Sequence, residues 1–136
     1  MTKRMRFAVG VAVAAALLLT GVPAVFAHHS FAAEFDASKP FKLTGLVTKV
    51  EWQNPHTYFY IDVTDAATGK VTNWAMEMGS PNGLMRQGWT RNTLKIGDIV
   101  AVEGSVARTG QPLGNARTVT LTSTGQRLFA ASSQAP

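Results

Sequence analysis

The three histidines are the residues of this chain best suited to binding a metal ion. His28 and His29 are adjacent, and His56 follows the pair Asn54-Pro55. If the chain were cut before His28, the new α-amino group and its imidazole would chelate a metal together. The His29 imidazole and the intervening backbone amide would offer a competing chelate. Nitrogen donors of this kind suit Cu(II) best among divalent ions. The alternative is that both histidines belong to a flexible, solvated end.

Met76 and Met78 offer a second kind of ligand. They are two residues apart in a stretch with strand-like alternation, so their side chains share one face. Two thioethers on one face would select Cu(I). Yet apolar residues on one side of a strand are usually core, and methionine fills irregular gaps well. His56 has the same two interpretations, as a ligand or as a residue that hydrogen-bonds the turn beside it.

Four aromatic residues form a candidate surface for a ligand or partner: Trp52, Tyr58, Tyr60 and Trp89. Tyr58 and Tyr60 alternate with Phe59 and Ile61, so the tyrosines face the opposite side of their strand from these apolar residues. They are suited to stacking on a glycan, a peptide or a protein partner. Equally, they suit cross-strand pairs that only stabilise a sheet.

The residues before His28 have the three parts of a secretory signal peptide. These parts are a basic start (Lys3, Arg4 and Arg6), an apolar middle (Phe7–Leu19) and a small-x-small cleavage site (Val25-Phe26-Ala27). We therefore expect cleavage after Ala27 and a mature, periplasmic protein that begins at His28. The membrane would then be contacted only transiently, through the signal peptide. The alternative is a leader that is retained as an anchor.

The charge balance argues against nucleic acid as a partner. The chain has 13 Lys and Arg against 8 Asp and Glu, and three of the basic residues lie in the predicted signal peptide. The mature chain therefore carries 10 basic and 8 acidic residues, whereas nucleic-acid binding favours clustered Lys and Arg. The chain has no cysteine, which excludes disulfides and thiolate ligands. No nucleophile or carboxylate pair has a spacing that indicates catalysis, so we do not expect an enzyme.

Strand-type patterns position these residues. The predicted strands are Phe41–Trp52, Thr57–Thr64, Val71–Met78, Ile99–Ala107 and Ala116–Ser123, with a short helix, Pro81–Gln87, between the third and the fourth. Ser80 is the expected N-cap of that helix and Gly88 its stop, while Gly45 predicts a bend or bulge in the first strand. Three strands, a helix and two strands is the order of the OB-fold, a five-stranded Greek-key barrel. A small sandwich is the main rival.

The predicted organisation is that of one domain. Residues 1–27 form the signal peptide, 28–40 an N-terminal extended segment, 41–129 the OB-fold-like domain, and 130–136 a flexible tail. All-β structure with one short helix is the expected fold class.

Several short motifs are spread over nearly the whole mature chain. They are Ala27-His28-His29-Ser30, Phe31–Asp36, Glu51–His56, Trp74–Glu77, Gly88–Arg91 and Gly97–Val100. Together they resemble an uncharacterised family of small exported proteins of Gram-negative bacteria. The resemblance implies export and a single domain, and it supplies no catalytic residue and no ligand.

A second resemblance concerns the segment Trp74–Met78. It is similar to the Trp and paired-Met segment of small periplasmic copper/silver efflux chaperones, which are OB-folds that hold Cu(I) with a His, two Met and a Trp. In this chain one residue, rather than two, separates Trp74 from Met76. We expect an exported binding protein whose ligand is copper. The alternative is a metal-free module that recognises a protein, peptide or glycan of the cell envelope.

Overall fold

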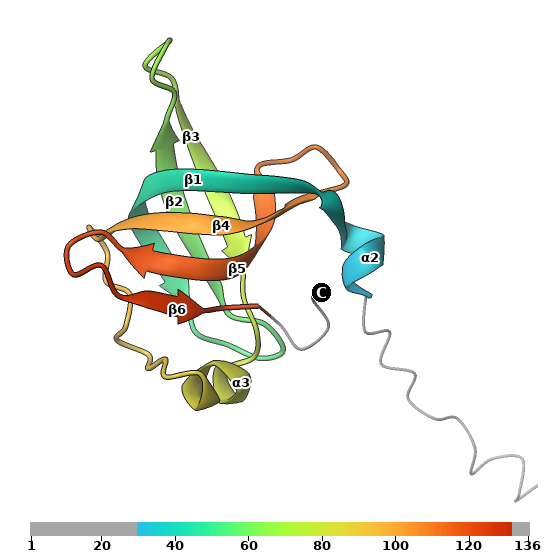
Figure 1. Cartoon of the computed structure of the whole chain (residues 1–136), viewed down its shortest axis with the longest axis vertical. Helices are drawn as coiled ribbons and strands as arrows, with labels where there is room; N and C mark the ends of the chain where they lie inside the picture. Colours follow the sequence, from blue (N-terminus) through green and yellow to red (C-terminus); the bar gives the residue numbers. More distant parts are fainter. Residues whose placement is uncertain (1–29, 132–136) are drawn as a thin grey trace, which may run out of the picture.

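The computed structural model describes residues 30–131, in which strands are the dominant elements (Figure 1). The elements are α2 (Phe31–Glu34), β1 (Phe35–Glu51), β2 (Tyr58–Thr64), β3 (Val71–Glu77), α3 (Pro81–Arg86), β4 (Ile99–Ala107), β5 (Leu113–Leu121) and β6 (Arg127–Phe129). Within residues 30–131, no helix is long and apolar enough to cross a bilayer.

The strand pairing closes a ring of five strands. β1 pairs with both β2 and β4. β2 then pairs with β3, and β4 pairs with β5, and all four pairings are antiparallel. The ring closes where β3 pairs in parallel with β5, and β6 is added outside the ring on β5. With α3 between β3 and β4, this is the OB-fold order, so the predicted fold class is confirmed. The short helix α2 and the strand β6 were not predicted.

The core fills the inside of the ring because alternate residues of each strand face inward. On β2, Phe59 and Ile61 are fully buried, and Phe59 pairs across the sheet with Met76 of β3. Other fully buried side chains come from β1, β4 and β5: Val47, Val100, Val102 and Val119. Burying each such side chain contributes about 1.5–3 kcal/mol. This apolar interior fixes which residues of β2 and β3 must face outward.

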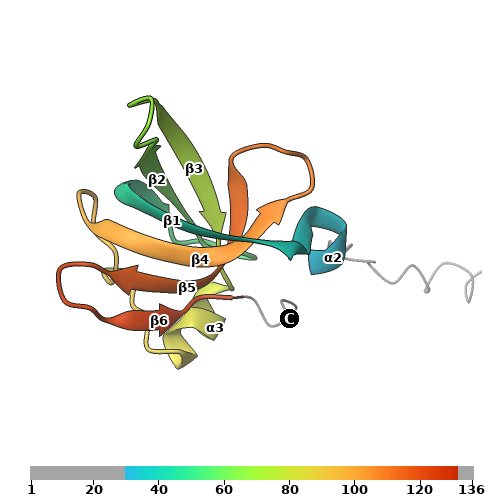
Figure 2. The same ribbon diagram turned by 45° about the horizontal axis from the view of Figure 1, so that its top comes forward.

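The helix α3 lies across one end of the ring, opposite the protruding β2–β3 hairpin (Figures 1 and 2). The Ser80 hydroxyl accepts a hydrogen bond from the Gly83 amide at 3.2 Å, which caps the helix as predicted. Gly88 follows with a φ of +92°, a conformation that favours glycine. Leu84 of the helix is buried against the core.

Strand pairing reaches beyond residues 41–129 at both ends. β1 begins at Phe35, which is buried and pairs with Ala107, so the strand starts inside the segment 28–40. At the other end Ala130 is buried, and its amide donates to the Arg117 carbonyl. The ordered pairing therefore extends beyond 41–129 on both sides. Residues 1–29 and 132–136, including the predicted signal peptide, lie outside the described residues.

The predicted distortion of β1 lies close to Gly45. The register of β1 against β2 shifts between Val47 and Lys49, two residues further on. A Cβ atom on Gly45 would lie 2.7 Å from the Asp62 carbonyl oxygen of β2. Glycine is therefore required there for the close approach of the two strands, and the bulge follows it.

Candidate functional site

A row of polar side chains crosses four strands on the outer face of the ring. The register pairs Glu51 of β1 with Tyr58 of β2, Tyr58 with Glu77 of β3, and Glu77 with Asn115 of β5. Tyr58 faces outward because the next residue of its strand, Phe59, faces the core, and residues paired across the strands share the face of Tyr58. We call Glu51, Tyr58, Glu77 and Asn115 the outer row.

Glu77 is a buried carboxylate in this row, with only 6% of its surface exposed. The Tyr58 hydroxyl donates to its Oε2 at 2.6 Å, and the Asn115 amide Nδ2 donates to its Oε1 at 3.3 Å. Such donors are required because a buried carboxylate without partners is costly. Burial, and then the hydrogen bond to Glu77, raise the pKa of Tyr58. Tyr58 therefore keeps its proton and remains a donor.

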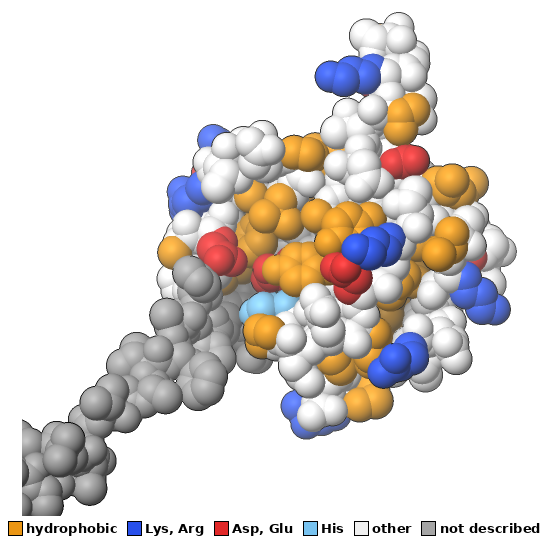
Figure 3. Space-filling view, turned by 180° about the vertical axis from the view of Figure 1, so that it is seen from behind, with side chains coloured by type: hydrophobic (Ala, Val, Ile, Leu, Met, Phe, Trp, Pro, Cys, Tyr) orange, Lys and Arg blue, Asp and Glu red, His pale blue; other side chains and the backbone are white. Residues whose placement is uncertain are grey.

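His56 reaches Glu77 from the loop between β1 and β2. Its Nδ1 lies 3.9 Å from Glu77 Oε1, which is beyond hydrogen-bond distance. Among residues 30–131 this buried nitrogen has no hydrogen-bond partner, although the side chain as a whole is 34% exposed. In the view of Figure 3, acidic side chains in red lie among hydrophobic side chains in orange. A small displacement would let Nδ1–H donate to Glu77.

The helix α2 is anchored beside the same cluster. The Arg108 Nε donates to the Ala32 carbonyl at 2.9 Å, and the Arg108 amide donates to the Glu34 carbonyl at 2.8 Å. The Glu34 carboxylate also contributes to the raised pKa of Tyr58, after burial and the interactions with Glu77. The first described residues therefore lie within electrostatic range of the outer row.

Tyr60 forms a second, more exposed contact with the outer row. Its hydroxyl donates to Glu51 Oε2 at 2.9 Å, and this hydrogen bond raises the pKa of Tyr60. Lys49 forms an ion pair with Glu51, and its Nζ lies 5.0 Å from the centre of the Tyr60 ring. The hydrogen bonds from Lys49 and from Tyr60 lower the pKa of Glu51. Both tyrosine hydroxyls predicted to face a partner are therefore already bound to carboxylates.

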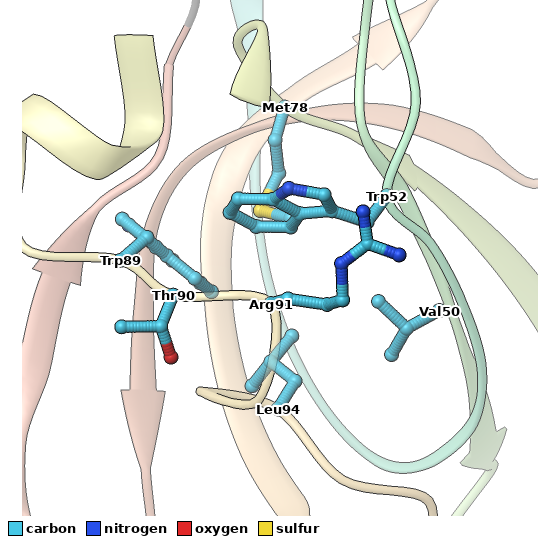
Figure 4. A pocket seen from close by; sticks show the side chains of 7 residues that line it. All are labelled: Val50, Trp52, Met78, Trp89, Thr90, Arg91 and Leu94. Atoms are coloured by element: carbon cyan, nitrogen blue, oxygen red, sulfur yellow. The ribbon is translucent and has the colours of Figure 1, made fainter. Parts of the chain in front are cut away.

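The two tryptophans of the predicted aromatic surface lie elsewhere. Trp52 and Trp89 line a shallow depression with Val50, Met78, Thr90, Arg91 and Leu94 (Figure 4). The depression has no room for a water molecule. Trp89 is only 2% exposed, and its Nε1 donates to the Phe129 carbonyl at 2.8 Å. The structure thus does not bring Trp52, Trp89 and the tyrosines onto one surface.

The predicted metal ligands lie in different surroundings. Met76 and Met78 are both fully buried in the apolar core, a placement that favours the core interpretation. Within residues 30–131, no three His, Asp or Glu side chains lie close enough together to hold a metal ion. His56 lies in the described range, and His28 and His29 lie outside it.

Glu77 and Asn115 were not among the predicted site residues. The alternation of β3 places Glu77 on the same face as Tyr58, and this signal was available in the sequence. The burial of Glu77 depends in addition on the parallel pairing of β3 with β5, which brings Asn115 beside it. That contact joins residues 38 positions apart and leaves no local pattern.

Comparison with known proteins identifies the family of this chain. Among solved structures, the mitochondrial single-stranded DNA binding protein Rim1 of S. cerevisiae matches with a TM-score of 0.49 and 12% sequence identity, over 62% of this chain and 93% of that one. No curated protein matches this chain. The family match covers residues 15–116, well over half of the sequence, and the chain therefore belongs to DUF6152, a family of unknown function.

Proposed function

We propose that this protein is an exported binding module that holds copper through its mature N-terminal histidines, with His56 as a further ligand. One observation carries the proposal. Glu34, at the end of the first described helix, and His56 both lie close enough to the outer row to interact with it electrostatically. The link runs through Glu34, whose charge acts on Tyr58, and through Glu77, which contacts both Tyr58 and His56.

The chemistry of the terminus supports copper. Cleavage after Ala27 would leave an α-amino group and two imidazoles directly before Ser30. Two residues span at most about 7 Å, so the proposed site would be tethered to the chain just before α2. The chain has three histidines and no cysteine, and this site would use all of its imidazoles. An all-nitrogen donor set favours Cu(II) among the divalent ions.

The test begins with protein purified from the periplasm. Its intact mass shows where the chain begins, and titration with Cu(II) against a competing chelator measures affinity. We expect a chain that begins at His28 and binds one copper ion tightly, and we expect the double variant His28→Ala/His29→Ala to lose this binding. A matched control keeps a peptide tag in front of His28, which leaves all imidazoles but moves the α-amino group away. Undiminished affinity in the double variant would contradict the proposal.

The second candidate is metal-free recognition of an envelope protein, peptide or glycan. It is favoured by the position of Tyr58 and Tyr60 on the outer face of β2, the region that OB-folds use for ligands. Peptide and glycan arrays probed with metal-free protein would test it. Binding that the variant Tyr60→Ala removes, in a protein that takes up copper only weakly, would favour this candidate over the first.

A further inference from the structure

We infer that Glu77 is a positioning residue for His56. In this arrangement the carboxylate holds the imidazole proton on Nδ1, so that Nε2 presents its lone pair to a divalent transition-metal ion. The inference rests on the proposed function, because the metal is the ligand proposed there. It adds a specific atom and a carboxylate that the sequence did not single out.

The first argument is the unpartnered nitrogen itself. Nδ1 of His56 is buried, has no hydrogen-bond partner among residues 30–131, and lies 3.9 Å from Glu77 Oε1. A buried polar atom without a partner costs stability, so such atoms are uncommon in native proteins. The Glu77 carboxylate oxygen in front of this nitrogen is an acceptor that a small movement would bring within hydrogen-bond distance. Hydrogen bonds at a site of this kind are often long before the ligand is bound.

The second argument is the chemistry of a carboxylate. An ionised carboxylate only accepts hydrogen bonds, and its charge repels the lone pair of a neighbouring ring nitrogen. A neutral imidazole with its proton on Nδ1 is therefore favoured beside Glu77 over the tautomer with its proton on Nε2. The proton on Nδ1 leaves Nε2 as the only nitrogen able to bind a metal.

The third argument is the rigidity of Glu77. Its two oxygens are bound separately, Oε2 by Tyr58 of β2 and Oε1 by Asn115 of β5, while Glu77 itself belongs to β3. Three strands of the ring therefore fix one carboxylate. Histidines that bind metals usually donate their other ring N–H to such a fixed acceptor, which sets the orientation of the ring. The imidazole of His56 is 34% exposed, which leaves part of the ring open to a ligand.

The chain offers a matched control in the other carboxylate of the outer row. Glu51 also accepts a hydrogen bond from a tyrosine, Tyr60, and it also lies on the outer face. The variants Glu77→Gln and Glu51→Gln each remove one negative charge from this row. Only the first should affect His56.

The first measurement uses the metal-free mature protein, labelled with ¹⁵N. Long-range ¹H–¹⁵N spectra identify the tautomer of each histidine, and metal is not required. We expect the Nδ1–H tautomer for His56 in the wild type and in Glu51→Gln, and a shift toward Nε2–H in Glu77→Gln. An Nε2–H tautomer in the wild type would overturn the inference, and this result does not depend on whether Glu77→Gln folds.

The second measurement is Cu(II) titration of the same three proteins against a competing chelator. We expect Glu77→Gln to weaken binding about 10- to 100-fold, the usual effect of losing the acceptor behind a ligating histidine, and Glu51→Gln to leave it unchanged. Equal affinity in Glu77→Gln and wild type would overturn the inference while the proposed function stands. An Nδ1–H tautomer in a wild type that binds no copper would overturn the proposed function and leave the positioning of His56 supported.

Discussion

Two neighbouring regions at the end of β1 are built in opposite ways. Trp52 lines a depression whose walls are mostly apolar and which has no space for a water molecule. Glu51, the residue before it, belongs to the outer row, where tyrosines and carboxylates bind one another. No residue that lines this depression has a buried polar side-chain atom without a hydrogen-bond partner among residues 30–131. Beside the outer row lies one buried nitrogen, Nδ1 of His56, that lacks a partner within residues 30–131.

The contrast shows which feature should guide a search for function. Apolar side chains around Trp52 satisfy one another by contact, and the indole N–H of the buried Trp89 already has a carbonyl acceptor. A buried polar atom without a partner cannot be satisfied by apolar packing. It requires a hydrogen-bond partner, which is a protein group, a water molecule or an ion. The unmatched nitrogen therefore directs attention to His56 and Glu77 rather than to the depression.

The largest expected effect concerns the apolar side of the same strands. Met76 is fully buried and pairs with Phe59, so Met76→Ala should lower the free energy of unfolding by about 2–5 kcal/mol. Met76→Leu keeps the volume and should cost less than about 1.5 kcal/mol. Urea denaturation measures both values. Equal losses in the two variants would mean that the sulfur of Met76 has a role that packing does not explain.

A smaller effect separates the two tyrosines of the outer face. Tyr58→Phe removes a donor from a buried carboxylate and should lower the free energy of unfolding by about 1.5–3 kcal/mol. Tyr60→Phe should cost clearly less, because Glu51 keeps Lys49 as its partner and is open to water. The two variants are compared by urea denaturation at neutral pH. Similar losses would contradict the different burial of the two carboxylates.

Much of the fold could be predicted from the sequence because its signals are local. The alternation around Phe59 sets the inner face of β2, and Ser80, Pro81 and Gly88 delimit α3 within one turn. The start of β1 was missed because Phe35 pairs with Ala107, at the far end of β4, and no local pattern marks this contact. The strand β6 was missed for the same reason, since it forms only by pairing with β5.

The site was less predictable than the fold. The sequence drew attention to His56 and Tyr58 as residue types that can do chemistry, and the structure brings both to Glu77. The alternation of β3 also indicated the face on which Glu77 lies, but not its burial, which depends on Asn115 across a parallel pairing. Trp89 was grouped with the tyrosines only because it is aromatic. It follows α3 in the chain, and its side chain is buried in the hydrophobic core.

The smallest expected effect is a shift in the titration of the tyrosines. The chain has only two, Tyr58 and Tyr60, so the near-ultraviolet absorbance of phenolate reports on the outer face alone. The pKa of Tyr58 is raised mainly by burial, and that of Tyr60 mainly by its hydrogen bond to Glu51. A folded pKa above the unfolded value means that the stabilisation is complete below about pH 10 and is lost as the pH rises through the folded pKa.

We therefore expect both phenolates to form only above about pH 10, first Tyr60 and then Tyr58. Glu51→Gln removes the charged acceptor of Tyr60, so it should move the first step back toward the ordinary pKa of tyrosine and leave the second in place. A spectrophotometric titration of the wild type and this variant measures both steps. A single step at the ordinary pKa in the wild type would contradict the carboxylate contacts of the outer face. A shift of both steps in Glu51→Gln would mean that Tyr58 and Tyr60 titrate as one coupled pair. The contact of Tyr58 with Glu77 and the contact of Tyr60 with Glu51 would then not be independent.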